Sequence, residues 1–135
     1  MALPTRMQLQ IVSADRSLVN ETVDEVEIPG SDGYFGVLPG HTPLVALIRI
    51  GDASYRSGKG ESHVVIGGGF CEVSKDVVTV LCDFAQLPDE IDLAAAQKEK
   101  AQAEEEMKTV GPDTFDAVQA RLDAANARVQ VASRH

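Results

Sequence analysis

The residues that could do chemistry in this sequence are few and scattered. Its histidines, His41, His63 and His135, and its two cysteines form neither a His-x-x-x-His nor a Cys-x-x-Cys pattern. A metal site needs ligands at such spacings, and nucleophilic catalysis needs a nucleophile beside a base. We therefore expect no metal, no cofactor and no catalytic activity of the chain's own.

Glycine-rich stretches are the second candidate, because such loops can cradle phosphate groups. The glycines between Gly30 and Gly40 do not form a Gly-x-Gly-x-x-Gly sequence that opens a helix, and Gly58-Lys59-Gly60-Glu61 lacks the Ser or Thr that would hold magnesium. They are better explained as turn residues. The run Gly67-Gly68-Gly69 predicts a bulge or kink where a strand passes close to another backbone.

The two cysteines are expected to be buried and reduced. If Ser74-Lys75-Asp76 is a tight turn, Cys71 lies opposite Thr79 and Cys82 lies opposite Gly68. The sulfur atoms are then out of register, and the hairpin does not offer the geometry of a disulfide. This favours a reducing compartment.

The charge of the chain excludes several classes of partner. Its 21 acidic and 12 basic residues give a net charge of −9. Nucleic-acid binding needs clustered Lys and Arg, and so does a patch for anionic lipids. No stretch approaches the roughly 20 consecutive apolar residues of a membrane span. We expect no nucleic acid and no direct lipid insertion. The start of the chain shows neither a signal peptide nor a transit segment, which favours a bacterial protein used where it is made.

Composition divides the chain into two domains, residues 1–87 and 88–135. Ten of the eleven glycines precede Leu87, and alanine, glutamate and lysine dominate after it. In the first part Met7, Leu9 and Ile11 alternate with polar residues, and turn residues recur about every ten positions. This pattern predicts an antiparallel β-sandwich or flattened barrel.

The second part has the period of amphipathic helices. Apolar residues spaced three and four apart predict two seams that pair as an antiparallel helical hairpin, giving an α+β fold. The first seam comprises Leu93, Ala96, Lys100, Ala103, Met107 and Val110, and the second comprises Phe115, Val118, Leu122, Ala125, Val129 and Ala132.

The segment from Glu27 to Leu44 places two aromatic residues on a Pro/Gly framework. Tyr34 and Phe35 beside Asp32 suit a tip that contacts another protein. Phe35 and Val37 also suit residues that close the end of the sandwich. The residues alone leave both interpretations open.

This segment carries the pattern Gly-x-x-Gly-x-x-Gly-x-x-Pro-Gly-His-x-Pro-Leu over Gly30 to Leu44. Together with Leu9 to Asp15, Gly67 to Val73 and Val77 to Leu81, it resembles the epsilon subunits of rotary proton-translocating ATP synthases, over essentially the whole chain. The resemblance implies a non-catalytic rotor subunit of the central stalk. Its partners would be the gamma subunit and the c ring, with transient contact to the alpha/beta catalytic head. It would lie peripherally on the cytoplasmic face of the bacterial inner membrane.

The resemblance also implies a contact site for the c ring at Ser31, Asp32 and Tyr34, with His41 nearby. Family members carry carboxylates at the positions of Asp32 and Tyr34, and only Asp32 retains one. The ring loop is expected to be basic and polar, which suits Asp32, whereas Tyr34 weakens the charge complementarity. The resemblance assigns no residues to the contact with gamma.

Some bacterial members bind ATP on the folded hairpin through an Ile-Asp-x-x-Arg-Ala motif and arginines of the second helix. Here Ile91 and Asp92 match, Ala95 replaces the arginine, and only Arg128 stands where a second-helix arginine is expected. Each lost charge-assisted contact costs about 1.5 to 3 kcal/mol. We expect no functional ATP site.

In this family the hairpin is permissive when folded and inhibits ATP hydrolysis when extended. Extension places basic helix residues against acidic surfaces of the catalytic head. Residues 88–135 hold ten acids and six bases, a net charge of −4. The resemblance and the charge together predict at most weak inhibition.

A second hypothesis is a small-ligand-binding β domain with a helical lid. It requires a sizeable apolar pocket inside the sandwich. A domain of about 85 residues has little core volume to spare for such a pocket.

Overall fold

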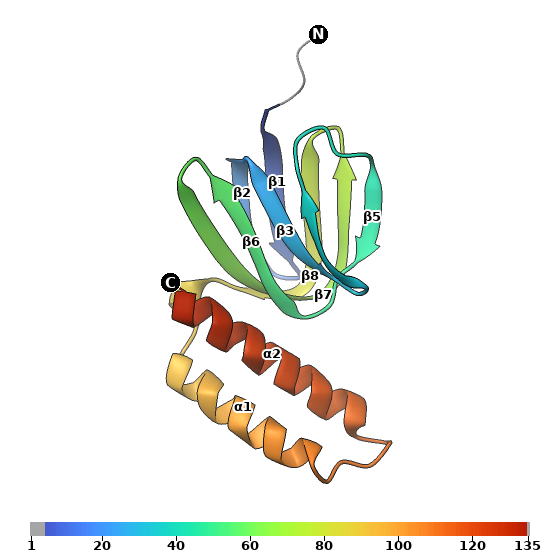
Figure 1. The fold of residues 1–135 in the computed structure, drawn as a ribbon, viewed down its shortest axis with the longest axis vertical. Coiled ribbons are helices and arrows are strands. Elements are labelled where there is room, and N and C mark those ends of the chain that lie inside the picture. The colour runs from blue at the N-terminus through green and yellow to red at the C-terminus, as the bar shows by residue number, and fades with distance from the viewer. Residues whose placement is uncertain (1–4, 135) are drawn as a thin grey trace.

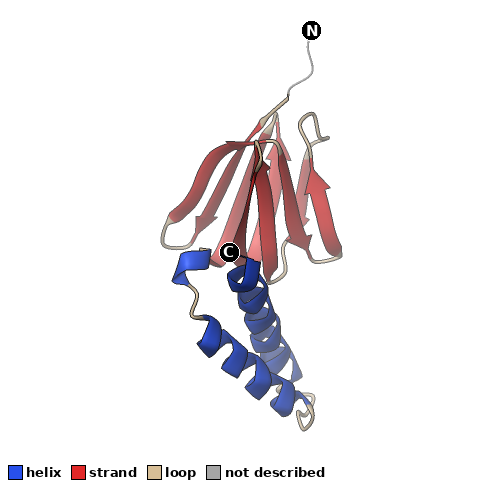
Figure 2. Ribbon diagram, turned by 60° about the vertical axis from the view of Figure 1, so that its left-hand side comes forward, coloured by secondary structure: helices blue, strands red, loops and turns tan. Residues whose placement is uncertain are grey.

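In the computed structural model, which describes residues 5–134, eight strands precede a short 3₁₀ turn and two helices. Figure 1 shows the strands wrapped into a sandwich and the two helices stacked beneath one end of it. Figure 2 shows the same division from a second direction. The elements are β1 (Met7–Ser13), β2 (Ser17–Val23), β3 (Glu25–Gly30), β4 (Gly33–Val37), β5 (Leu44–Leu47), β6 (Gly51–Ser57), β7 (Gly60–Ser74), β8 (Val77–Gln86), η1 (Pro88–Glu90), α1 (Leu93–Met107) and α2 (Phe115–Arg134).

The strands join in one continuous sheet with the order β2-β1-β8-β7-β6-β3-β4, and β5 pairs with β7 outside this path. The predicted sandwich and helical hairpin are therefore confirmed. One pairing departs from the antiparallel expectation: β1 and β8 run parallel, with Leu9 opposite Val78 and Ile11 opposite Val80. The first and last strands of the sandwich meet there, a long-range contact that local turn patterns do not specify.

The core of the sandwich follows the alternation seen in the sequence. Met7, Leu9 and Ile11 are buried, while the residues between them are half-exposed. Each fully buried aliphatic side chain of this kind contributes about 1.5 to 3 kcal/mol relative to exposure. Other fully buried side chains of this core include Val23, Val26, Ile28, Val37, Val64, Ile66, Val73, Val78 and Val80.

The glycine triplet sits at a bend of β7, as predicted. Before the bend β7 pairs with β6, and after it β7 pairs with β5. Gly68 and Gly69 have positive φ angles of 66° and 116°. A Cβ on Gly69 would lie 2.0 Å from the Leu81 carbonyl oxygen, and one on Gly67 would lie 2.3 Å from the Phe84 ring. Only glycine fits this close approach.

The β7–β8 turn corrects the predicted register by one residue. Lys75 and Asp76 both have positive φ angles, 52° and 63°, so the turn has two central residues rather than three. Cys71 therefore faces Val80 rather than Thr79, and Cys82 faces Gly69 rather than Gly68. Both cysteines are nonetheless free and buried, as expected.

The helical hairpin confirms the first predicted seam and part of the second. In α1, Ala96 and Ala103 are buried and the other seam residues are partly buried. In α2, Val118 and Ala125 are buried, but Phe115 is 44% exposed, so its predicted place in the seam is wrong. Helix α2 lies between α1 and the sandwich (Figure 1), so it needs a second apolar face.

That second face was not predicted from the heptad spacing. Ala127 and Val131 of α2 pack against Val65 of β7, with Phe84 and Ile91 at the edge of this cluster. The residues concerned are small, so the contact between hairpin and sandwich buries little apolar area.

Candidate functional site

The β3–β4 turn presents two of the predicted ring-contact residues to solvent. Gly30 pairs with Gly33, which leaves Ser31 and Asp32 as the exposed turn residues. The Ser31 amide donates a hydrogen bond of 2.9 Å to the Leu47 carbonyl oxygen, so the turn is tied to the end of β5. The Asp32 carboxylate is thus displayed on a fixed backbone.

Tyr34 lies next to this turn and is partly held by the sandwich. The Arg49 guanidinium lies 5.0 Å from the centre of its ring, a cation–π contact. Its hydroxyl oxygen accepts a 3.4 Å hydrogen bond from the Asp52 amide. Tyr34 is nevertheless 45% exposed, whereas Phe35 packs on the core and Val37 is buried within it. Phe35 and Val37 therefore close the end of the sandwich, while Tyr34 remains exposed and available for a contact.

His41 is not near these three residues, contrary to expectation. Strand β4 runs away from the first turn, and His41 follows it in the loop at the far end. There the Gly40 amide donates a 2.9 Å hydrogen bond to the Asp76 carboxylate of the β7–β8 turn. The structure thus brings Ser31, Asp32 and Tyr34 together and separates His41 from them.

An exposed apolar row crosses three neighbouring strands of the sandwich. Leu47 of β5 faces Phe70 of β7, and Phe70 faces Leu81 of β8. Directly paired residues point to the same side of a sheet, so the three side chains line up. Each is between 39% and 69% exposed. We refer to Leu47, Phe70 and Leu81 as the apolar row; contiguous exposed apolar surface of this kind marks interaction sites.

The row escaped the sequence analysis because it depends on strand pairing rather than on local pattern. Leu47 and Phe70 belong to strands separated by β6, and only their register brings them together. The sequence could have indicated only one part of the row: a β7–β8 hairpin with the correct register places Phe70 opposite Leu81.

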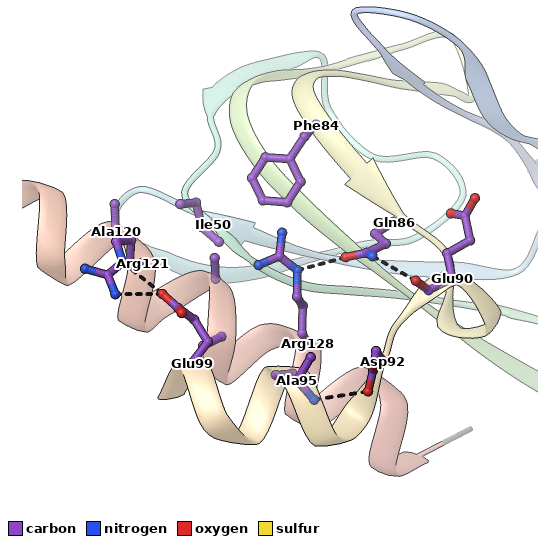
Figure 3. A pocket seen from close by; sticks show the side chains of 13 residues that line it. Ile50, Phe84, Gln86, Glu90, Asp92, Ala95, Glu99, Ala120, Arg121 and Arg128 are labelled. Carbon is purple, nitrogen blue, oxygen red and sulfur yellow. Dashed lines mark hydrogen bonds and ion pairs between the residues drawn. The ribbon is translucent and has the colours of Figure 1, made fainter. Parts of the chain in front are cut away.

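A cavity of about 640 Å³ lies between the hairpin and the sandwich. It is not inside the sandwich, where the hypothesis of a small-ligand-binding domain placed it. Figure 3 shows Arg128 of α2 reaching into it toward Phe84 and Gln86. The Arg128 Nε donates a 2.8 Å hydrogen bond to Gln86, and its guanidinium lies 5.5 Å from the Phe84 ring.

The other residues that align with the ATP-binding motif, Ile91, Asp92 and Ala95, lie at the same junction of hairpin and sandwich. Asp92 caps α1, because its carboxylate accepts a 3.0 Å hydrogen bond from the Ala95 amide (Figure 3). Ala95 offers only a methyl group to the cavity. Ile91 packs on the apolar cluster between hairpin and sandwich. The structure thus brings Asp92, Ala95 and Arg128 to one cavity.

Arg121 also lines the cavity, although the motif did not indicate it. Its guanidinium forms ion pairs with Glu99 and Glu106 of α1. Hydrogen bonds to these two carboxylates raise the pKa of Arg121 above its ordinary value. Its positive charge is therefore already balanced within the hairpin.

The connection between the domains is held by Glu90. Its two carboxylate oxygens accept hydrogen bonds of 2.6 and 2.7 Å from Arg16, which follows β1. One of them also accepts a 2.8 Å bond from the Leu87 amide. The Arg16 and Leu87 donors lower the pKa of Glu90 to about 2. η1 is thereby fixed to the sandwich at the start of the hairpin.

Over the described part of the chain, residues 5–134, no three His, Cys, Asp or Glu side chains are grouped so that they could hold a metal ion. None of the described helices is long and apolar enough to cross a membrane.

Comparison with known proteins identifies the family to which the chain belongs. Residues 6–88 match the model of the ATP synthase, Delta/Epsilon chain, beta-sandwich domain. Residues 89–133 match that of the ATP synthase, Delta/Epsilon chain, long alpha-helix domain. The ATP synthase epsilon chain of Solibacter usitatus is 40% identical over 134 residues, which cover 98% of this chain and 99% of that one. The ATP synthase epsilon chain 2 of Syntrophotalea carbinolica is 39% identical, with 96% and 95% covered.

Solved structures share the fold. A chain of the Euglena gracilis mitochondrial ATP synthase, OSCP/F1/c-ring, superposes with a TM-score of 0.84 at 24% identity, covering 100% of this chain and 85% of that one. A chain of the Tetrahymena thermophila mitochondrial ATP synthase central stalk/c-ring gives 0.66 at 12% identity, covering 98% and 99%. With both of its domains matched and relatives near 40% identical over almost their full length, the chain belongs to the ATP synthase delta/epsilon chain family.

Proposed function

We propose that this ATP synthase epsilon chain is a non-catalytic rotor subunit that joins the c ring to the gamma subunit in the central stalk. Its relatives are ATP synthase epsilon chains, and its fold occurs in assemblies described as F1/c-ring and central stalk/c-ring. The observation that carries the proposal is the apolar row beside an exposed acidic turn on a rigid sandwich. Residues 1–87 transmit torque, and residues 88–135 regulate.

The apolar row is the proposed contact for gamma. Leu47, Phe70 and Leu81 lie on three paired strands, so their positions are fixed by backbone hydrogen bonds before a partner arrives. Preorganised apolar anchors of this kind supply much of the affinity at a protein interface.

The β3–β4 turn is the proposed contact for the c ring. Ser31, Asp32 and Tyr34 are exposed together, and the single carboxylate suits a basic, polar ring loop. Because the Ser31 amide bonds to Leu47, the turn adjoins the apolar row, and one rigid unit touches both partners. His41 follows the far end of β4 and lies outside this proposed contact.

As a part of this complex the chain is placed peripherally on the cytoplasmic face of the bacterial inner membrane. The partners carry it there, since the net charge of −9 disfavours anionic lipids. Contact with the alpha/beta catalytic head is transient and made by the hairpin. The net charge of −4 on residues 88–135 supports at most weak inhibition of ATP hydrolysis.

Two variants test the two contacts separately. Leu47→Glu should weaken co-purification with gamma by at least about tenfold, because it places a charge in an apolar contact. Leu38→Glu is the matched control: Leu38 is similarly exposed, 56% against 69%, and lies outside the row. It should co-purify normally.

An Asp32→Ala/Tyr34→Ala double variant should keep gamma but lose ATP synthesis driven by proton flow. If this variant assembles and synthesises ATP like the wild type, the ring contact is wrongly assigned. If Leu47→Glu binds gamma normally, the gamma contact is wrongly assigned.

The cavity at the hairpin supports the proposal that this chain does not bind ATP. Ala95 supplies no positive charge, Arg128 already bonds to Gln86, and Arg121 is paired with Glu99 and Glu106. A triphosphate would have to break these contacts before making its own. Calorimetric titration of the purified chain should show no binding at micromolar ATP, and saturable binding in that range would contradict the proposal. Ala95→Arg should raise the affinity.

A further inference from the structure

Asp52 is a buried carboxylate at the junction of the two domains. It is 5% exposed and is the only charged side chain among the described residues that is buried. It stands at the start of β6, opposite Val65, which packs against α2. An ionised carboxylate in such a place is costly unless partners compensate it.

The partners of Asp52 come from both domains. His63 of β7 is part of the sandwich, and its Nδ1 lies 2.9 and 3.2 Å from the two carboxylate oxygens. Because a carboxylate only accepts, His63 donates there and fixes the orientation of Asp52. The second partner is Arg134 in the last turn of α2, whose Nη1 donates a 3.2 Å hydrogen bond to Oδ2. Of these two contacts of the Asp52 carboxylate, only the one with Arg134 comes from the hairpin.

The two side chains of this ion pair differ in exposure, as expected for a contact that can open. Asp52 stays in the sandwich, aligned by His63, whereas the Arg134 side chain is 57% exposed and can return to water. The apolar contact beside it is small, with Ala127 and Val131 as its buried α2 residues. The Arg134–Asp52 ion pair therefore acts together with the Arg128–Gln86 hydrogen bond in holding α2 on the sandwich.

From this geometry we propose that Arg134 and Asp52 form a charge latch that keeps the hairpin folded on the sandwich. When the latch opens, α1 and α2 leave together, because Arg121 holds them to each other. The connection stays in place, because Arg16 and Glu90 fix η1 to the sandwich. The hairpin then turns about the residues that follow Glu90.

The test measures the position of the hairpin in the isolated full-length chain, so it does not depend on the proposed rotor function. Spin labels on Lys59→Cys in the β6–β7 turn and Lys108→Cys at the end of α1 report their separation by pulsed electron resonance; both sites are exposed. Burial raises the pKa of the Cys71 and Cys82 thiols to about 11, which keeps them unreactive during labelling at pH 7.

Arg134→Gln should increase the ratio of undocked to docked chains about fivefold. Arg134→Lys, which keeps the charge, should retain most of the docking. Lys98→Gln is the control, because it removes an exposed positive charge of the hairpin that takes no part in the contact with Asp52. It should leave the docked fraction unchanged.

A double-variant cycle separates the latch from unrelated effects. Asp52→Asn should also raise the undocked fraction, and Asp52→Asn combined with Arg134→Gln should do so no more than either change alone. Additive effects, or an unchanged distance distribution in Arg134→Gln, would overturn the proposal. Since Arg134 is exposed, its variant remains informative even if Asp52→Asn fails to fold.

Discussion

Glu90 shows how a single carboxylate fixes the start of the helical hairpin. It lies in η1, between the last strand and the first helix, and it binds both Arg16 and the Leu87 amide. These donors bond to the ionised form of the carboxyl group, which is why its pKa falls from the ordinary 4.5 to about 2. The contact therefore depends on pH in a defined direction.

Replacing Glu90 with Gln should lower the thermal midpoint at pH 7 and remove a pH-dependent contribution to stability. The native pKa is depressed, so the contribution is fully present above about pH 4.5 and disappears as the pH falls toward 2. Thermal unfolding followed by circular dichroism should show nearly the same difference between wild type and variant at pH 7 and 4.5, and a largely lost difference at pH 2. Glu105→Gln, which removes an exposed ion pair with Lys108, should show no such trend. A constant difference would contradict the assignment.

At the scale of the element, the bend of β7 decides the shape of the sandwich. One strand of 15 residues pairs with β6 before the bend and with β5 after it. The apolar row depends on this bend, because Phe70 directly follows the glycine triplet. The sequence predicted the close approach from the triplet itself, but it could not show which strands the two halves of β7 would join.

Gly69→Ala should destabilise the chain by about 2 to 4 kcal/mol, because the new methyl group would lie 2.0 Å from the Leu81 carbonyl oxygen. Gly58→Ala is the matched control: Gly58 also has a positive φ angle, 65°, but no atom lies within 4 Å of a Cβ there. It should cost only the backbone strain of about 1 kcal/mol. Urea unfolding of both variants measures the difference, and equal losses would show that crowding at Gly69 is unimportant.

At the scale of the whole molecule, local patterns predicted the sandwich and the helical hairpin well, and contacts distant in sequence were predicted poorly. Alternation placed Leu9 and Ile11 in the core, and helical spacing placed Ala96 and Ala103 in the hairpin seam. The parallel pairing of β1 with β8 was missed because no turn connects them.

The candidate sites divide in the same way. The exposed turn at Ser31 and Asp32 could be predicted, since turn residues are local. The separation of His41, the apolar row and the partners of Asp52 depend on how strands and helices meet, so no single segment of sequence carries them. The second apolar face of α2, with Val131, was hidden for this reason too.

The charge of the hairpin leads to the last prediction, which concerns the assembled complex. Residues 88–135 carry a net charge of −4, so an extended hairpin would be repelled by acidic surfaces of the catalytic head. Removing these residues should therefore change ATP hydrolysis by less than about twofold, or ~0.4 kcal/mol at the barrier. A variant with Glu104, Glu105 and Glu106 replaced by Lys changes the hairpin charge from −4 to +2 and should inhibit hydrolysis more strongly than the wild type. The measurement is the rate of ATP hydrolysis by the wild-type, truncated and Lys-variant complexes. Strong activation on truncation would mean that the hairpin inhibits hydrolysis despite its acidic helices. An unaltered rate in the Lys variant would mean that the charge of the hairpin does not set the strength of inhibition.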